Sequence, residues 1–178
     1  MQVKSGPTRS LDLSGTGSCA AFNFRRTARA VTRLYDLGLE PSGIRSTQFA
    51  ILTAVAKFQP VAISRIGDIL LLDQSTLTRS LRLLEKQGFL DITPRSARRQ
   101  RFLSVTESGA KALAVAIPLW RTVQSNFLAM MGGAEWSELR NELERMARLA
   151  VKLEEAALTL GTGQDVPKSE AKLTPDPV

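Results

Sequence analysis

Residues 63–90 read ISRIGDILLLDQSTLTRSLRLLEKQGFL, and this stretch predicts two helices joined by a tight turn. The first helix is short, covers about residues 64–71 and has Ser64 as its expected N-cap. Its apolar side consists of Ile66, Ile69 and Leu70. Residues 71–73 then provide a turn of the length that joins the two helices of a helix-turn-helix motif.

The second helix of this stretch begins after Asp73, a favourable N-cap, and runs to about Gln87. Gly88 follows it as a residue that adopts the left-handed conformation without strain. Helical spacing puts three leucines on one side, which we expect to be buried: Leu77, Leu81 and Leu84. The opposite side carries polar groups that can bond base edges or phosphates: Gln74, Ser75, Thr78, Arg79 and Arg82.

A hairpin is predicted directly after these helices, with strands over residues 89–92 and 102–105. The connection between the strands contains no acid and four arginines: Arg95, Arg98, Arg99 and Arg101. Like charges this close together indicate either a solvated loop or an anionic partner, and the phosphates of DNA would neutralise them. A short helix, a turn, a polar-faced helix and a hairpin with a basic tip form the plan of a winged helix-turn-helix, whose second helix enters the major groove.

Further helices are predicted on both sides of this motif. They cover about residues 19–37, with Ser18 as N-cap, and residues 46–58, 106–131 and 134–160. The last of them carries apolar residues in near-heptad spacing: Trp136, Leu139, Leu143, Met146, Ala150 and Leu153. Because such seams exceed what a small central core needs, we expect long N- and C-terminal helices that form a dimer interface. The fold class is therefore mainly α, an α+β winged helix-turn-helix with dimerisation helices.

The composition narrows the classes of function. The chain has 178 residues, a net charge of +7, one cysteine and no histidine. The charge fits a polyanionic partner, while the lack of histidine removes the commonest general base and metal ligand. We therefore expect no enzyme, no metal site and no cofactor. No apolar run has the length of a signal peptide core or a membrane span, so we expect a cytoplasmic protein without membrane contact.

The ends of the chain differ in composition from its middle. Residues 1–17 and 161–178 show no helical or strand period and predict a disordered arm and a disordered tail. The domain would then span residues 18–160, with its DNA-binding part over about residues 46–106.

Over residues 18–160 the chain resembles the MarR family of bacterial transcriptional regulators. The likeness is strongest in TQFAIL (47–52), in the stretch 63–90 quoted above, and in RRQRFLSVTESGAK (98–111). It implies a homodimer that binds a palindromic operator on double-stranded DNA as a repressor and is released by a small effector or by oxidation. By position, the resemblance assigns DNA contact to seven residues: Ser75, Thr76, Thr78, Arg79, Arg82, Arg98 and Arg99. We expect Ser64 and Gln74 to contact DNA as well. The family's wing usually reads aspartate-arginine-arginine, whereas here Ala97 takes the aspartate position and the wing is one residue shorter.

The resemblance leaves the signal open. Family ligands commonly bind between the first, second and fifth helices, where a small aromatic or phenolic effector could meet Phe24, Ala28, Phe49 and Leu52, although these residues serve a core equally well. The family's organic-hydroperoxide sensors carry a reactive cysteine close to the place of Cys19, so a thiol-based peroxide-sensing repressor is the alternative. Those sensors surround their thiolate with tyrosines, whereas Tyr35 is the single tyrosine of this chain, so we favour an unreactive Cys19. A winged-helix protein-interaction module would need neither the arginine wing nor the polar helix face.

Overall fold

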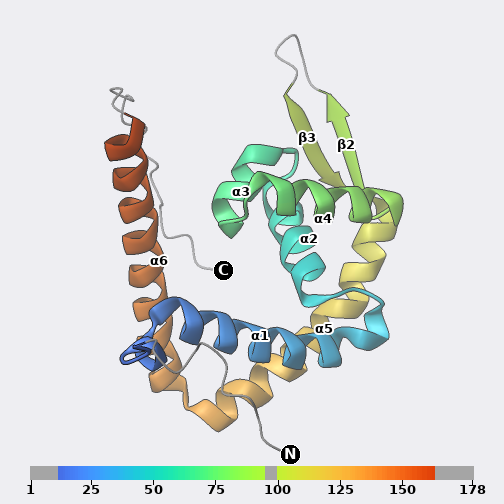
Figure 1. Ribbon diagram of the computed structural model, residues 1–178. Helices are drawn as coiled ribbons and strands as arrows, with labels where there is room; N and C mark the ends of the chain where they lie inside the picture. Colours follow the sequence, from blue (N-terminus) through green and yellow to red (C-terminus); the bar gives the residue numbers. More distant parts are fainter. Residues whose placement is uncertain (1–11, 95–99, 163–178) are drawn as a thin grey trace, which may run out of the picture. The chain divides into compact units, whose positions relative to one another are not determined.

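The structure, a computed structural model, describes residues 12–94 and 100–162 (Figure 1). The chain divides into two compact units, residues 1–126 and residues 127–178. Most of the expected arm and nearly all of the expected tail lie outside the described residues. Three of the predicted wing residues lie outside them as well: Arg95, Arg98 and Arg99.

The described residues form the long and short helices that the sequence predicts, within about two residues at each end. The α-helices are α1 (Ala20–Leu39), α2 (Ser46–Phe58), α3 (Ile63–Leu70), α4 (Gln74–Lys86), α5 (Glu107–Met131) and α6 (Gly133–Thr162). Two 3-10 turns, η2 (Thr16–Ser18) and η3 (Glu40–Ser42), flank α1. Of the helices in this described part, none combines the length and the apolarity that a membrane span requires.

Three strands form a small antiparallel sheet in the first unit. They are β1 (Val61–Ala62), β2 (Leu90–Pro94) and β3 (Arg101–Val105), in the order β1-β3-β2. The two long strands make the predicted hairpin, with Leu90 opposite Val105 and Pro94 opposite Arg101. The sequence did not predict β1, because two residues are too few to show the alternation that marks a strand. Its pairing of Val61 with Leu103 joins the hairpin to the start of α3.

Two predicted helix caps are wrong. Ser18 ends the 3-10 turn η2, where its hydroxyl donates to the Gly15 carbonyl at 2.8 Å, so Cys19 becomes the N-cap of α1. Ser64 lies inside the first turn of α3, because β1 holds Ala62 in the extended conformation that an N-cap needs. The conformation of the backbone before each helix therefore determines where α1 and α3 begin.

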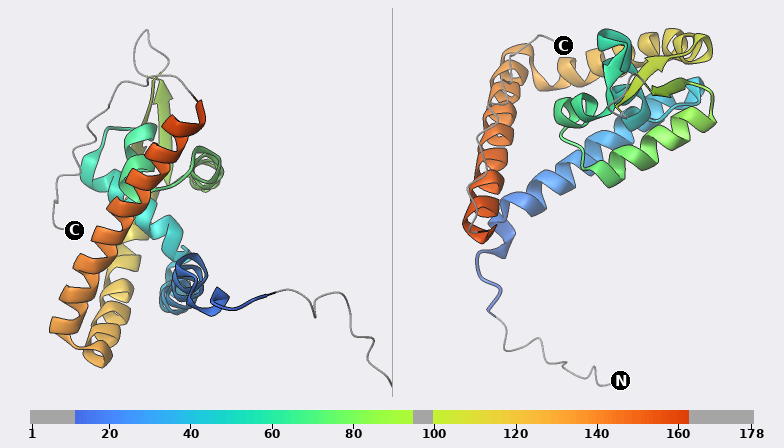
Figure 2. Two further views of the ribbon diagram at one scale, coloured as in Figure 1. Left: turned by 60° about the vertical axis from the view of Figure 1, so that its left-hand side comes forward. Right: turned by 90° about the horizontal axis from the view of Figure 1, so that it is seen from above.

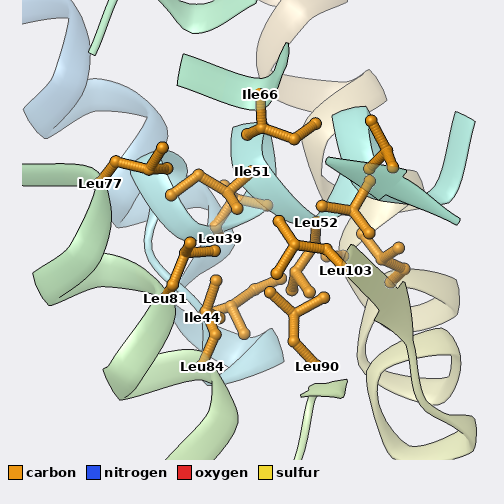
Figure 3. Packing of buried hydrophobic residues seen from close by; sticks show 14 residues of the cluster. Leu39, Ile44, Ile51, Leu52, Ile66, Leu77, Leu81, Leu84, Leu90 and Leu103 are labelled. Carbon is orange, nitrogen blue, oxygen red and sulfur yellow. The ribbon is translucent and has the colours of Figure 1, made fainter. Parts of the chain in front are cut away.

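The core of the first unit surrounds α2 (Figure 3). Helix α2 contributes Ile51, Leu52 and Val55, each at most 1% exposed. The predicted stripe of α4 is confirmed, since its three leucines are buried against this centre: Leu77, Leu81 and Leu84. Gly88 follows α4 with φ 73°, as the sequence predicts for the residue that ends this helix. Burial of one complete face of α4 fixes which side chains remain on the other face.

Thr106 holds the base of the wing hairpin against the end of α4. Its hydroxyl donates to the Gly88 carbonyl at 2.6 Å, and its backbone N–H donates to the Phe89 carbonyl. The same hydroxyl accepts the N–H of Gly109 at 3.0 Å and so caps the start of α5. A side chain at Gly109 would collide with the Phe89 carbonyl, so this close approach requires glycine.

Helix α1 is held on α5 within the first unit by two contacts. A side chain at Gly38 would collide with Val123, so the two helices approach closely there. The Tyr35 hydroxyl also donates to Gln124. The partial burial of Tyr35 raises the pKa of its phenol.

The second unit contains the end of α5 and the whole of α6. Gly132, with φ 94°, separates the two helices, and Gly133 is the first residue of α6. Phe127 and Trp136 meet edge to face across this turn, with ring centroids 6.1 Å apart. The described side chains of α6 include no buried residue, although its predicted seam contains several large apolar ones.

Candidate nucleic-acid interface

The N-terminus of α4 is fixed by the carboxylate of Asp73. One oxygen of Asp73 accepts the Thr76 N–H at 2.9 Å and the Ser75 hydroxyl at 2.6 Å, and the other accepts the Thr76 hydroxyl at 2.6 Å. Hydrogen bonds from the Ser75 and Thr76 hydroxyls and from the Thr76 N–H hold the pKa of Asp73 far below its usual range. The predicted cap at Asp73 is thus confirmed, and the hydroxyls of Ser75 and Thr76 stabilise it by donating to the carboxylate.

The polar face of α4 forms a shallow hollow of about 610 Å³ on the surface. Its lining is the set of side chains that the sequence placed on this face: Gln74, Ser75, Thr78, Arg79 and Arg82. In the views of Figure 2, α4 lies on an outer side of the first unit, with α2 on its inner side. The predicted recognition residues are therefore brought together on one exposed surface.

Two arginines lie on this face of α4. Arg79 and Arg82 are exposed, and neither takes part in a salt bridge with another described residue. Long guanidinium groups that emerge from a helix can fork onto the O6 and N7 acceptors of guanine in the major groove. The face therefore offers cationic donors together with amide and hydroxyl groups, which is the chemistry of base reading.

The other predicted DNA contacts lie on neighbouring elements. Ser64 is exposed in the first turn of α3, and Arg101 is exposed at the start of β3. Arg65 follows Ser64 and places its guanidinium 5.2 Å from the ring centroid of Phe58. Lys57 lies 5.4 Å from the same centroid. No local sequence pattern marks these two basic residues, because their common partner Phe58 lies on a different helix from Arg65.

The four residues proposed for an effector cleft lie in different environments. Phe24 and Ala28 are exposed on α1, and Phe24 is 43% exposed. Phe49 stacks on Trp120 of α5 with ring centroids 5.9 Å apart, and Leu52 is fully buried in the core. The structure thus brings Phe49 and Leu52 into the α2 core and leaves the other two on the surface of α1.

A different cavity lies where α1 meets α2. Its volume is about 350 Å³, and its lining combines two basic and two acidic side chains with apolar ones: Arg33, Asp36, Leu37, Glu40, Gly43, Ile44 and Arg45. Cys19 lies at the other end of α1, where its thiol is exposed. Within the described residues, no group of three cysteine, aspartate or glutamate side chains is arranged to hold a metal ion.

Comparison with known proteins agrees with this geometry. The sequence model of the MarR family matches residues 42–101. The chain is similar to the transcriptional regulator MosR of M. tuberculosis, solved in complex with DNA, at 30% identity over 76% of this chain and 98% of that one, with a TM-score of 0.70. It is 27% identical over 119 residues to the organic hydroperoxide resistance transcriptional regulator of Bacillus subtilis (strain 168), which covers 66% of this chain and 79% of that protein.

The fold also matches the PcaV transcriptional regulator from Streptomyces coelicolor, solved with its natural ligand, at 20% identity and a TM-score of 0.69 over 79% of this chain and 99% of that one. A short helix, a turn, an exposed polar helix and a hairpin define a winged helix-turn-helix DNA-binding protein. The three proteins named above are transcriptional regulators. The chain belongs to the MarR family and is a DNA-binding transcriptional regulator.

Proposed function

We propose that the protein is a homodimeric repressor that acts in the cytoplasm, binds a palindromic operator and is released by a small effector. The observation that carries the proposal is the exposed face of α4, where Arg79 and Arg82 project without a salt bridge to any described residue from a helix whose other side is buried. Such a face is suited to base edges in the major groove.

The homodimer is supported by the apolar seam of α6. Leu139, Leu143 and Met146 are 38–39% exposed, and Leu153 is 62% exposed. Near-heptad spacing of large apolar side chains is typical of helices that pack on another helix, and a second copy of α6 offers the same seam. A two-fold dimer would present two α4 helices roughly 34 Å apart, one turn of DNA, which matches a palindromic site.

We propose that the wing arginines bind phosphate or the adjacent minor groove. Arg101, the described member of the set, is exposed at the end of the hairpin, and the other members lie between β2 and β3: Arg95, Arg98 and Arg99. A contact to the backbone adds affinity for every sequence alike, so it complements the base reading assigned to α4.

For the signal, we propose a small aromatic or phenolic effector near Phe24, Ala28, Phe49 and Leu52. The support is the stacked pair of Phe49 in α2 and Trp120 in α5, half-buried aromatic rings on which a further ring could pack. The alternative is oxidation of Cys19, which is favoured by its exposure and by the similarity to the hydroperoxide resistance regulator. We retain the first because the chain has a single cysteine, so no second thiol can resolve a sulfenic acid within the chain.

Two measurements test the proposal. A duplex selected by the protein from a random library should be palindromic and should bind one dimer, with an affinity that falls steeply as salt rises. Light scattering of the free protein should give twice the chain mass of 19.4 kDa at micromolar concentration. A monomer that binds asymmetric sites would contradict the proposal that a homodimer binds a palindromic operator.

A separate gel shift distinguishes the two signals. Wild type and Cys19→Ser are bound to the selected duplex and treated with organic hydroperoxide. We expect both proteins to stay bound. Release of the wild type alone at low-micromolar peroxide would establish the thiol-based repressor instead.

A further inference from the structure

Gln48 in α2 is the one polar side chain that is buried among the described residues, with 6% of its surface exposed. Its amide bonds two different parts of the first unit. The Gln48 Oε1 atom accepts the backbone N–H of Arg45 at 2.8 Å, and the Nε2 atom donates to Oε1 of Gln87 at 2.7 Å. Gln87 is the C-cap of α4, the helix with the candidate recognition face.

This contact differs in kind from the leucine packing that also holds α4. Apolar contacts have little directional preference, so a helix seated on leucines alone can rotate or slide by a fraction of an ångström at small cost. A buried amide needs its hydrogen bonds, because a buried polar group without a partner costs about 1–3 kcal/mol. Gln48 therefore favours one position of the C-terminal end of α4.

The hydrogen bonds continue from Gln48 to α1. Asp36 of α1 accepts the backbone N–H and the hydroxyl of Ser46, each at 2.7 Å, and its other oxygen lies 3.4 Å from the guanidinium of Arg45. Partial burial raises the pKa of Asp36, but the hydrogen bonds from Ser46 and the charge of Arg45 outweigh that effect and lower it below its usual value. Asp36 thus stays ionised at the N-terminus of α2, where a negative charge is favourable.

We infer that Gln48 is a positioning residue for DNA reading: it fixes the recognition helix α4 relative to the N-terminus of α2, and through Arg45, Ser46 and Asp36 relative to α1. All these groups lie in the first compact unit. The inference rests on the proposed role of α4 in base recognition. Bidentate contacts to bases tolerate little displacement, whereas contacts to phosphates tolerate more. Loss of the Gln48 bonds should therefore lower discrimination between sequences more than overall DNA affinity.

The test compares the full-length wild type with Gln48→Leu, which keeps the volume and removes the hydrogen bonds. The affinity of each protein is measured for the duplex that the wild type selects and for a scrambled duplex of equal length at the same salt. We expect the ratio of the two affinities to fall about five- to tenfold in Gln48→Leu, as one to two lost hydrogen bonds imply. Affinity for the scrambled duplex and its salt dependence should not change.

Three companion variants keep the test decisive. Gln124→Leu removes another side-chain hydrogen bond between helices, the bond from Tyr35, and should leave the ratio unchanged because it does not touch α4. Gln48→Glu retains two acceptors for Arg45 and for a rotated Gln87 amide, so it should recover most of the ratio. Gln87→Leu alters an exposed position and breaks the same bond, so it replaces Gln48→Leu if that variant does not fold.

The outcomes separate this inference from the proposed function. If the wild type discriminates between the duplexes and folded Gln48→Leu or Gln87→Leu discriminates equally well, the positioning role is wrong. An equal loss on both duplexes also overturns it, since that result means only that less protein is folded. If the wild type itself shows no preference, the assignment of α4 as recognition helix fails first.

Discussion

Helices α4 and α6 carry the same kind of apolar pattern and use it differently. In α4 the leucines Leu77, Leu81 and Leu84 are 3%, 2% and 0% exposed. In α6 the corresponding seam residues Leu143 and Met146 are each 38% exposed. The periodicity of apolar residues shows which face of a helix must be buried. It does not show whether that face packs against the same chain or against another one. The chain buries the face of α4 in its own core, whereas the exposed seam of α6 is suited to a second chain.

The largest expected effect comes from the buried side of this comparison. Leu84→Ala should lower the free energy of unfolding by about 2–5 kcal/mol, because it leaves a cavity in the core around α2. Leu83→Ala, on the adjacent residue that is 49% exposed, serves as control and should cost far less. Urea denaturation followed by circular dichroism measures both. Equal losses in the two variants would mean that the burial of this stripe does not stabilise the fold.

Substitutions in the exposed seam of α6 should weaken dimerisation. Replacing Leu143 and Met146 together by glutamate should weaken dimerisation by about 2–3 kcal/mol, roughly 100-fold, since each chain would bring two charges into an apolar interface. Sedimentation against concentration measures the change, and circular dichroism should show the helices retained. Asn141→Glu, on the same helix outside the seam, is the control. A double variant as dimeric as the wild type would place the interface elsewhere.

On the exposed face of α4, Arg79→Ala should reduce binding to the selected duplex by about 1–3 kcal/mol if this side chain reads a base. The fold should be intact, because Arg79 contributes nothing to the buried stripe. Lys86→Ala at the far end of the same helix removes an equal charge and controls for general electrostatics. Fluorescence anisotropy with the selected and scrambled duplexes gives both values. Unchanged affinity of a folded Arg79→Ala dimer would exclude the role.

The wing should show a contrasting behaviour. Replacing Arg98 and Arg99 by alanine should weaken binding to all sequences alike and flatten the dependence of log affinity on log salt by roughly 1–2 units per subunit. The measurement is a salt titration on both duplexes. An altered base preference with an unchanged salt dependence would contradict the phosphate or minor-groove role.

The smallest effect at neutral pH concerns the cap of α4. The pKa of Asp73 is lowered from its ordinary value of 3.8, so the cap stabilises the folded state fully above that value and loses its contribution as pH falls toward the lower folded value. We expect the melting temperature of the wild type to decline below about pH 4 more steeply than that of Asp73→Asn, whose neutral amide still caps. Parallel acid profiles of the two proteins would show that this carboxylate does not contribute.

The sequence predicted the features that depend on local pattern. The cap at Asp73, the leucine stripe of α4 and the left-handed Gly88 follow from residue type and spacing, and all are confirmed. The caps predicted at Ser18 and Ser64 were wrong, because the conformation of the preceding residues decides where a helix begins. The 3-10 turn η2 precedes α1, and the strand β1 precedes α3. A short strand such as β1 exists only through its partner and leaves no local pattern.

The candidate site likewise has one part that local sequence predicts and one part that depends on tertiary packing. The members of the α4 face were readable from their spacing, and the structure gathers them on one surface. The bond between Gln48 and Gln87 joins residues 39 positions apart and could not be read from either segment. The second bond of the Gln48 amide, which it accepts from the Arg45 N–H, is local, since a glutamine three residues after the N-cap often bonds back to the helix start. The bond to Gln87 depends on how α4 packs against α2, which tertiary packing alone determines.

The contact between Thr106 and Gly88 separates the anchoring of the hairpin from the chemistry of its tip. Two residues 18 positions apart are joined at the base, and strand pairing continues from Leu90 and Val105 to Pro94 and Arg101. The bonds that fix the hairpin to the end of α4 therefore belong to residues outside the connection between the strands. A substitution at Ala97 removes none of these bonds. The charge of the tip can thus be redesigned as a separate module, while the hydrogen bonds at the end of α4 remain the same.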